Sequence, residues 1–311
     1  MTYSIVARDP ATGRFGVAVQ SHYLGVGPVV PWLEAGVGAV ATQANVNISF
    51  GPIGLELLRA GRPADEVVAA LMASDDRPEV RQLGVVDAEG RAAAHTGAEC
   101  IPACGHLVRD GFTVQGNLLQ RETCWPAMAT AYEAALGAGE PLVECLLRAM
   151  EAAEGEGGDV RGRQSAAIMI VDSAVHAAAW RGRLMDLRIE DHPDPVPELR
   201  RIVTLQLAYE QMDDEGEAAK AGRPAEERYE EARRLAPGAY ELVFWRGLAL
   251  ATGGDVAAGR RELEIAFAAD TRWRTTLEHL AAAGREGVTP ELAEQLLPDL
   301  PAREMGRGIG A

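Results

Sequence analysis

Lysine is almost absent from this chain. Of its 30 Lys and Arg residues only Lys220 is lysine, so arginine supplies nearly all of the side-chain positive charge. Because no lysine occurs in residues 1–198, Schiff-base chemistry is excluded from that part of the 311-residue chain.

Positive charge is also scarce relative to negative charge. The formal net charge is −16, and neither the part before Leu199 nor the part after it is basic. An acidic surface repels phosphate backbones and anionic lipid. We therefore expect no nucleic-acid partner and no membrane partner.

Long apolar runs and cysteine motifs are missing as well. No run approaches the roughly 18 apolar residues of a membrane span, and the N-terminus enters a strand pattern directly, so we expect a cytoplasmic protein without a signal peptide. The spacing of Cys100, Cys104, Cys124 and Cys145 matches no zinc or redox signature. Reduced thiols with no metal and no cofactor are expected; Cys100 and Cys104 as metal ligands are the alternative.

Strand and helix patterns occur in blocks over residues 1–198. Two N-terminal strands, a third strand and two helices are followed by further strands, two helices and a final hairpin, in which residues 175–180 are expected to pair with 166–171. Blocks of this kind favour an α+β layered domain over a doubly wound α/β domain.

The pattern changes after residue 198, where helices alone are predicted. Ala232 and Ala266 lie 34 residues apart, and Pro237 and Thr271 follow the corresponding helices. This is the period of tetratricopeptide-like helical repeats. The predicted domains are therefore 1–198, α+β; 199–300, all-α and repeat-like; and a tail at 301–311.

The first strand places Thr2 where a chain-terminal amine would stand if Met1 were removed. A threonine with its own free α-amine can act as nucleophile and base together. The alternative is an ordinary polar residue at the start of an edge strand. Ser4 faces the same side as Thr2 but has no free amine.

Polar residues at strand ends are the other candidates for a site. Gln43 and Asn45 lie in a polar loop after a strand and either donate hydrogen bonds in a pocket or satisfy the turn. Asn117 follows a glycine at a strand end, where it either donates to an oxyanion or caps the next helix. Arg161 and Arg163 are suited to hold a substrate carboxylate, with a solvated ion pair to Asp159 as the alternative.

Several long segments resemble an uncharacterised bacterial and archaeal family that is assigned to the N-terminal-nucleophile (Ntn) hydrolase superfamily. The resemblance covers about residues 2–205 and is carried in order by TYSIVARDPATGRFGVAVQSHYLGVGPVVPW, AGVGAVATQANVNISFGPIGLELL, GVVDAEGRAAAHTG, FTVQGNLL, GDVRGRQSAA and DLRIEDHPDPVPELRR. The helical C-terminal part is similar to an appendage found in only some members.

The resemblance implies a four-layer αββα sandwich and amide-bond hydrolysis. The first hairpin is similar to the opening of proteasome β subunits. On that register Gln20 falls where those subunits hold an acidic residue, and His22 falls near their arginine. Their supporting lysine has no counterpart here.

These features lead to a hydrolase hypothesis for a small amide or short peptide-like substrate. Thr2 would be the nucleophile and Asn117 would hold the oxyanion, while Gln43, Asn45, Arg161 and Arg163 would bind substrate. The alternative is a catalytically silent scaffold whose helical repeats recruit a partner; a metal-dependent hydrolase using His22 and His95 is a third. A homo-oligomer is expected in each case.

Overall fold

The computed structural model describes residues 2–213 and 216–297, in which the chain is a mixed α+β protein with two antiparallel sheets. Contacts divide it into two compact units, Met1–Ile202 and Val203–Ala311. The boundary falls within α5 (Pro195–Met212), at residue 202 rather than 198. Met1 and the expected tail at 301–311 lie outside the described residues.

The larger sheet has the strand order β10-β9-β2-β1-β8-β7, so the N-terminal strand lies in its middle. Tyr3 of β1 pairs with Gln20 of β2, and Thr2 pairs with Asn117 of β8. The strands are β1 (Thr2–Arg8), β2 (Phe15–Ser21), β7 (Gly105–Arg109), β8 (Phe112–Asn117), β9 (Ser165–Val171) and β10 (Arg183–Ile189). Thr2 therefore does not start an edge strand.

The smaller sheet has the order β3-β4-β5-β6. Its strands are β3 (Pro31–Glu34), β4 (Gly38–Ala44), β5 (Arg81–Asp87) and β6 (Ala92–Thr96). Gln43 of β4 lies opposite Gln82 of β5. Because β4 continues to Ala44, Gln43 is a strand residue and not part of the polar loop to which the sequence assigned it.

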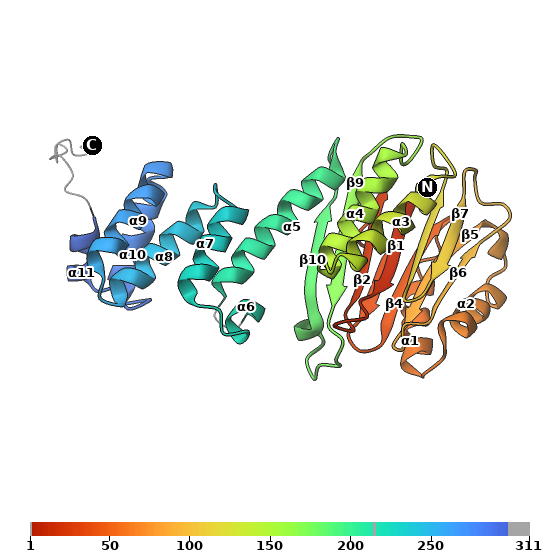
Figure 1. Ribbon diagram of the computed structural model, residues 1–311, viewed down its shortest axis with the longest axis horizontal. Coiled ribbons are helices and arrows are strands. Elements are labelled where there is room, and N and C mark those ends of the chain that lie inside the picture. The colour runs from red at the N-terminus through yellow and green to blue at the C-terminus, as the bar shows by residue number, and fades with distance from the viewer. Residues whose placement is uncertain (1, 214–215, 298–311) are drawn as a thin grey trace, which may run out of the picture. The chain divides into compact units, whose positions relative to one another are not determined.

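The two sheets contact each other through β1 with β4 and through β5 with β8. On the outer faces, α3 (Cys124–Gly137) and α4 (Leu142–Gly155) cover the larger sheet, and α1 (Phe50–Arg59) and α2 (Ala64–Ala73) cover the smaller one (Figure 1). Both faces of β1 are thus covered, which explains why residues 2–7 are buried without alternation.

One predicted strand is wrong. Residues 175–178 are irregular, and β9 pairs instead with β10. Val175 and Trp180 are 73% and 77% exposed, whereas Met185 of β10 is buried. The apolar composition of 175–180 suggested a strand, but burial against the neighbouring layers selected the later segment. Strands β3 and β7 were not expected from the sequence.

The space between the sheets is apolar at one end and polar at the other. Val6, Val17, Ala39 and Val86 belong to the apolar cluster. The other end holds buried polar side chains from both sheets, namely Thr2, Ser4, Ser21, Gln43, Gln82, Thr113, Gln115 and Asn117. The first strand itself makes this change, because Thr2, Ser4 and Val6 all lie on its inner face.

In the described residues of the second unit, all of the regular secondary structure is helical. Its helices after α5 are α6 (Glu217–Lys220), α7 (Ala225–Leu235), α8 (Tyr240–Thr252), α9 (Val256–Ala269), α10 (Arg272–Ala283) and α11 (Pro290–Leu296). Phe244, Leu263, Phe267, Leu277 and Leu296 belong to one buried cluster. The 34-residue repeat character of these helices stays a prediction.

Gly84 provides a test of the packing between the sheets. A Cβ built at Gly84 lies 2.5 Å from both Gln115 Oε1 and Thr113 Oγ1. We expect Gly84→Ala to lower the free energy of unfolding by about 1–3 kcal/mol, because overpacking displaces a rigid interior. Urea unfolding followed by circular dichroism measures the change.

Gly137→Ala is the matched control, since no atom lies within 4 Å of a Cβ built at this helical position. It should leave stability unchanged or slightly raised. A Gly84→Ala transition that coincides with that of the wild type would contradict the tight packing.

Candidate functional site

Thr2 lies at the polar end of the space between the sheets and is 4% exposed. Its hydroxyl donates to Ser21 Oγ at 3.1 Å. Its carbonyl oxygen is approached by the side-chain amides of Gln43 at 3.4 Å and Asn117 at 3.5 Å. The structure thus brings Thr2, Gln43 and Asn117 together, although they are far apart in the sequence.

The orientation of these amides follows from Gln82. Its Nε2 donates to the main-chain oxygens of Gly105 at 3.1 Å and Gly116 at 2.8 Å. Because a carbonyl only accepts, Gln82 Oε1 must face the opposite way. There it accepts from Gln43 Nε2 at 2.7 Å and from Asn117 Nδ2 at 2.8 Å.

Ser4 belongs to the same network. Its hydroxyl donates to Gln43 Oε1 at 2.6 Å and accepts from Gln115 Nε2 at 2.7 Å. The Ser4 hydroxyl therefore holds the side-chain amides of Gln43 and Gln115 in place.

Asn117 has a carbonyl oxygen that takes no part in the network. The residue is 1% exposed, and its side-chain hydrogen bonds to described residues are made by Nδ2. Among the described residues, Oδ1 accepts no hydrogen bond, and this atom is not completely buried. Asn117 also lines a cavity of about 420 Å³.

The cavity is lined by the end of β4, by Val80, by residues 99–101 and by the end of β8. Val80 and Cys100 are buried, whereas Ile101 is 49% exposed. The complete lining is Ala44, Asn45, Val80, Glu99, Cys100, Ile101 and Asn117. An apolar wall with a few polar groups and a volume in the hundreds of Å³ is typical of small-molecule sites.

Two non-glycine residues in the left-handed region mark the edge of this cavity. Ala44 has φ 68° and directly follows Gln43, and Leu118 has φ 49° and directly follows Asn117. Such conformations cost of order 1 kcal/mol or more for a residue with a Cβ. They turn the chain sharply, so the two amides are the last inward-facing groups of their strands.

Comparison with known families places residues 2–199. They match the model of DUF1028, described as a family of unknown function. The chain belongs to this family. A crystal structure of a DUF1028 protein from Silicibacter pomeroyi is similar, with 30% identity and a TM-score of 0.59 over 71% of this chain and 93% of that chain. No curated protein matches the chain.

Asn45 lies at the rim of the DUF1028 cavity and is fixed by Arg81. The guanidinium of Arg81 donates to the Asn45 main-chain oxygen at 2.5 Å and approaches its Oδ1 at 3.3 Å. Arg81 also pairs with Asp75 at 3.2 Å. Asn45 therefore has a held position beside the site.

Arg161 and Arg163 do not line this cavity. Arg161 pairs with the buried carboxylate of Asp159 at 2.8 Å. Arg163 pairs with Asp194 at 2.7 Å and with Glu154, to which the Tyr3 hydroxyl also donates. Both guanidinium groups are engaged by carboxylates of the protein.

Gln20 does not lie beside Thr2, and the His22 main-chain N–H donates to Asp159 Oδ2 at 3.0 Å. Alternation along β2 points Gln20 toward the helical layer, so Ser21 is the β2 residue beside Thr2. Gln20 is fully buried, and among the described residues both of its side-chain polar atoms lack a partner. His95 bonds the Pro78 main-chain oxygen at 2.9 Å, as expected of a structural histidine.

Sequence reasoning missed Gln82, Gln115 and Ser21 because polar residues at strand ends also suit solvent. The signal available in the sequence was the alternation of polar and apolar residues along these strands. In β5 and β8, Gln82 and Gln115 alternate with apolar residues of strands that are otherwise buried. Polar positions in such strands indicate a buried network once both faces are covered.

Residues 2–213 and 216–297 contain neither a metal-ligand cluster nor a membrane-spanning helix. No group of three or more His, Cys, Asp or Glu residues is placed to hold a metal ion. None of the described helices has the length and apolar character to cross a membrane. The four cysteines are free thiols, and burial raises the pKa of Cys100.

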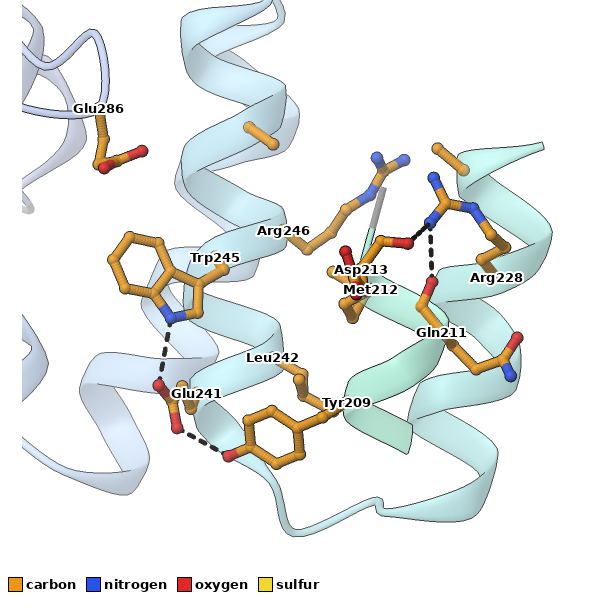
Figure 2. Close-up of a pocket in the computed structure, with 12 residues that line it drawn as sticks. Tyr209, Gln211, Met212, Asp213, Arg228, Glu241, Leu242, Trp245, Arg246 and Glu286 are labelled. Carbon is orange, nitrogen blue, oxygen red and sulfur yellow. Dashed lines mark hydrogen bonds between the residues drawn. The ribbon is translucent and has the colours of Figure 1, made fainter. Parts of the chain in front are cut away.

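A second cavity, of about 540 Å³, lies within the helical unit (Figure 2). Glu241 accepts a hydrogen bond from the Tyr209 hydroxyl at 2.7 Å and from Trp245 Nε1 at 3.3 Å. Arg228 donates to two main-chain oxygens at the end of α5. A fixed carboxylate beside a partly exposed indole suits a cationic group.

The amide network ends at His106, which gives a pH prediction. Thr96 receives a bond from Gln82 and lies 2.8 Å from His106 Nδ1. Burial lowers the pKa of His106 below its ordinary 6.5, and neighbouring His95 lowers it further. Below pH 6.5 the unfolded chain therefore binds the proton first, so the free energy of unfolding should fall as pH falls from 6.5.

Urea unfolding between pH 5 and 8 measures this dependence. His106→Gln keeps an acceptor for Thr96 and does not titrate, so its decline at acid pH should be shallower than that of the wild type. His279→Gln, at an exposed position on α10, is the control and should leave the decline unchanged. Equal slopes for wild type and His106→Gln would rule out this role for His106.

Proposed function

We propose that the DUF1028 unit is an Ntn-type amidohydrolase with the four-layer αββα architecture of that superfamily. The observation that carries the proposal is the position of Thr2. Its buried hydroxyl lies at the start of a central strand, bonded to Ser21, and its carbonyl contacts Asn117 on the wall of the cavity. The family match gives no activity, so the argument rests on this geometry.

The proposed reaction begins with removal of Met1, which frees the Thr2 amine. The Thr2 oxygen attacks the substrate carbonyl carbon while its proton passes to that amine. The carbon–nitrogen bond then breaks, and the leaving amine takes the proton. Water attacks the resulting ester, with the Thr2 amine again as base, and releases the acid.

Asn117 is the proposed oxyanion donor. One of its two N–H groups is fixed on Gln82 Oε1 at 2.8 Å, but the other makes only a 3.5 Å contact with the Thr2 carbonyl. A contact of that length is weak. The second N–H is therefore the donor that is most easily redirected to a developing negative charge.

A β-lactone probe and intact-mass measurement test the nucleophile. We expect the purified protein to lack Met1 and to form one adduct, mapped to residue 2. Thr2→Ala should abolish the adduct, and Thr2→Ser should retain it because the hydroxyl and amine are kept.

The rates at which these variants hydrolyse small amides should follow the same ranking, with Thr2→Ala at least about 10³-fold slower than wild type. A retained Met1, or a Thr2→Ala variant that reacts as fast as wild type, would refute the nucleophile. Far-UV circular dichroism of each variant confirms that loss of reaction is not loss of fold.

The helical unit favours a second candidate function, recruitment of a partner by a silent DUF1028 unit. Trp245 is 36% exposed and Tyr209 is 38% exposed, and both fix the Glu241 carboxylate. This cavity would take a lysine or arginine side chain of a partner peptide, since an indole and a carboxylate both attract a cation.

Fluorescence anisotropy with short lysine-containing peptides tests this second function. Trp245→Ala should weaken binding roughly five-fold or more, the order expected for a lost cation–π contact. Trp180→Ala, at a 77% exposed position in the other unit, is the matched control. Equal affinities for both variants would exclude the Trp245 cavity as the peptide site.

A further inference from the structure

The cavity beside Asn117 has a charge and hydrogen-bonding character that restricts its ligand. Glu99 is the one charged residue among those that line it. Its carboxylate is 3.9 Å from an Arg77 guanidinium nitrogen, and both side chains are more than half exposed. A pair of that length in water is weak, so Glu99 keeps its attraction for a cation at the rim.

The buried end of the cavity offers an acceptor as well. Asn117 lines the cavity, and among the described residues its Oδ1 accepts no hydrogen bond. The orientation of this amide is not free, because Gln82 Oε1 requires a donor from it. An N–H group of a ligand would give this oxygen the hydrogen bond that no described residue supplies, so the site favours a ligand with an N–H donor.

The described arginines near this cavity already have acidic or main-chain partners. Arg77 at the rim contacts Glu79 at 3.4 Å as well as Glu99. Arg81 is the nearest guanidinium to Asn45, and it is held by Asp75 and the Asn45 carbonyl. Arg161 and Arg163, expected from the sequence to bind a substrate carboxylate, are paired elsewhere. The remaining walls are apolar and include Val80 and Ile101.

We infer that this cavity binds the aminoacyl part of an apolar amino-acid amide, with the free ammonium group near Asn117 Oδ1 and Glu99. The apolar side chain contacts Val80 and Ile101, and amides that carry a carboxylate are rejected. That such an amide is also a substrate rests on the proposed function. Binding itself is independent of it.

Two ligands isolate the ammonium group. Leucinamide and 4-methylpentanamide share one carbon skeleton and one amide, and they differ only in the amine. Isothermal titration of the full-length Thr2→Ala variant measures binding without turnover. We expect leucinamide to bind roughly three- to ten-fold more tightly, as for one partly exposed charge contact, and succinamate to show no binding.

Glu99→Gln should remove most of that preference and leave the affinity for 4-methylpentanamide unchanged. Glu66→Gln, which removes one exposed carboxylate of α2 outside the cavity, is the matched control and should keep the preference. Equal binding of leucinamide and 4-methylpentanamide, or a preference unaffected by Glu99→Gln, overturns the inference.

The outcome separates the inference from the hydrolase proposal. If leucinamide binds with the expected Glu99 dependence but wild-type protein neither cleaves it nor reacts with the β-lactone, the hydrolase proposal fails and the ligand class stands. If wild type hydrolyses amides through Thr2 without this preference, the ligand class is wrong and the hydrolase stands.

Discussion

The fixed direction of the Gln82 amide is the interaction on which the polar half of the structure depends. Two main-chain carbonyls and the Thr96 hydroxyl share its N–H groups, and this leaves Oε1 to receive Gln43 and Asn117. Buried amides without partners are costly, so the arrangement is specified and not merely allowed. Through it, both sheets are held in register around Thr2.

The same arrangement fixes the orientation of Asn117. Its Nδ2 donates to Gln82 Oε1 and approaches the Thr2 carbonyl, and the residue also lines the cavity. The apolar half of the space between the sheets supplies the stability that a network of this kind does not. Asn117 belongs both to the amide network around Thr2 and to the lining of the cavity, and it stands on a strand, which positions side chains more rigidly than a loop does.

The helical unit is separate in composition and packing. It has its own apolar cluster around Phe244 and Leu263 and its own cavity around Trp245. The DUF1028 match ends at residue 199, before this unit begins. Any function of these helices therefore has to be argued from their own residues.

The sequence by itself determined the α+β class and most helices and strands, because these follow from local periodicity and turn chemistry. It also identified Thr2 and Asn117 as candidate site residues from their positions at strand ends. Only the tertiary structure decided which polar residues meet. Strand register brought Gln82 and Ser21 into the network around Thr2. Carboxylates of the protein pair with Arg161 and Arg163, whose part in substrate binding stays a prediction. The physical reason is that local pattern sets whether a side chain faces inward, whereas its partners come from distant strands whose pairing no local pattern encodes.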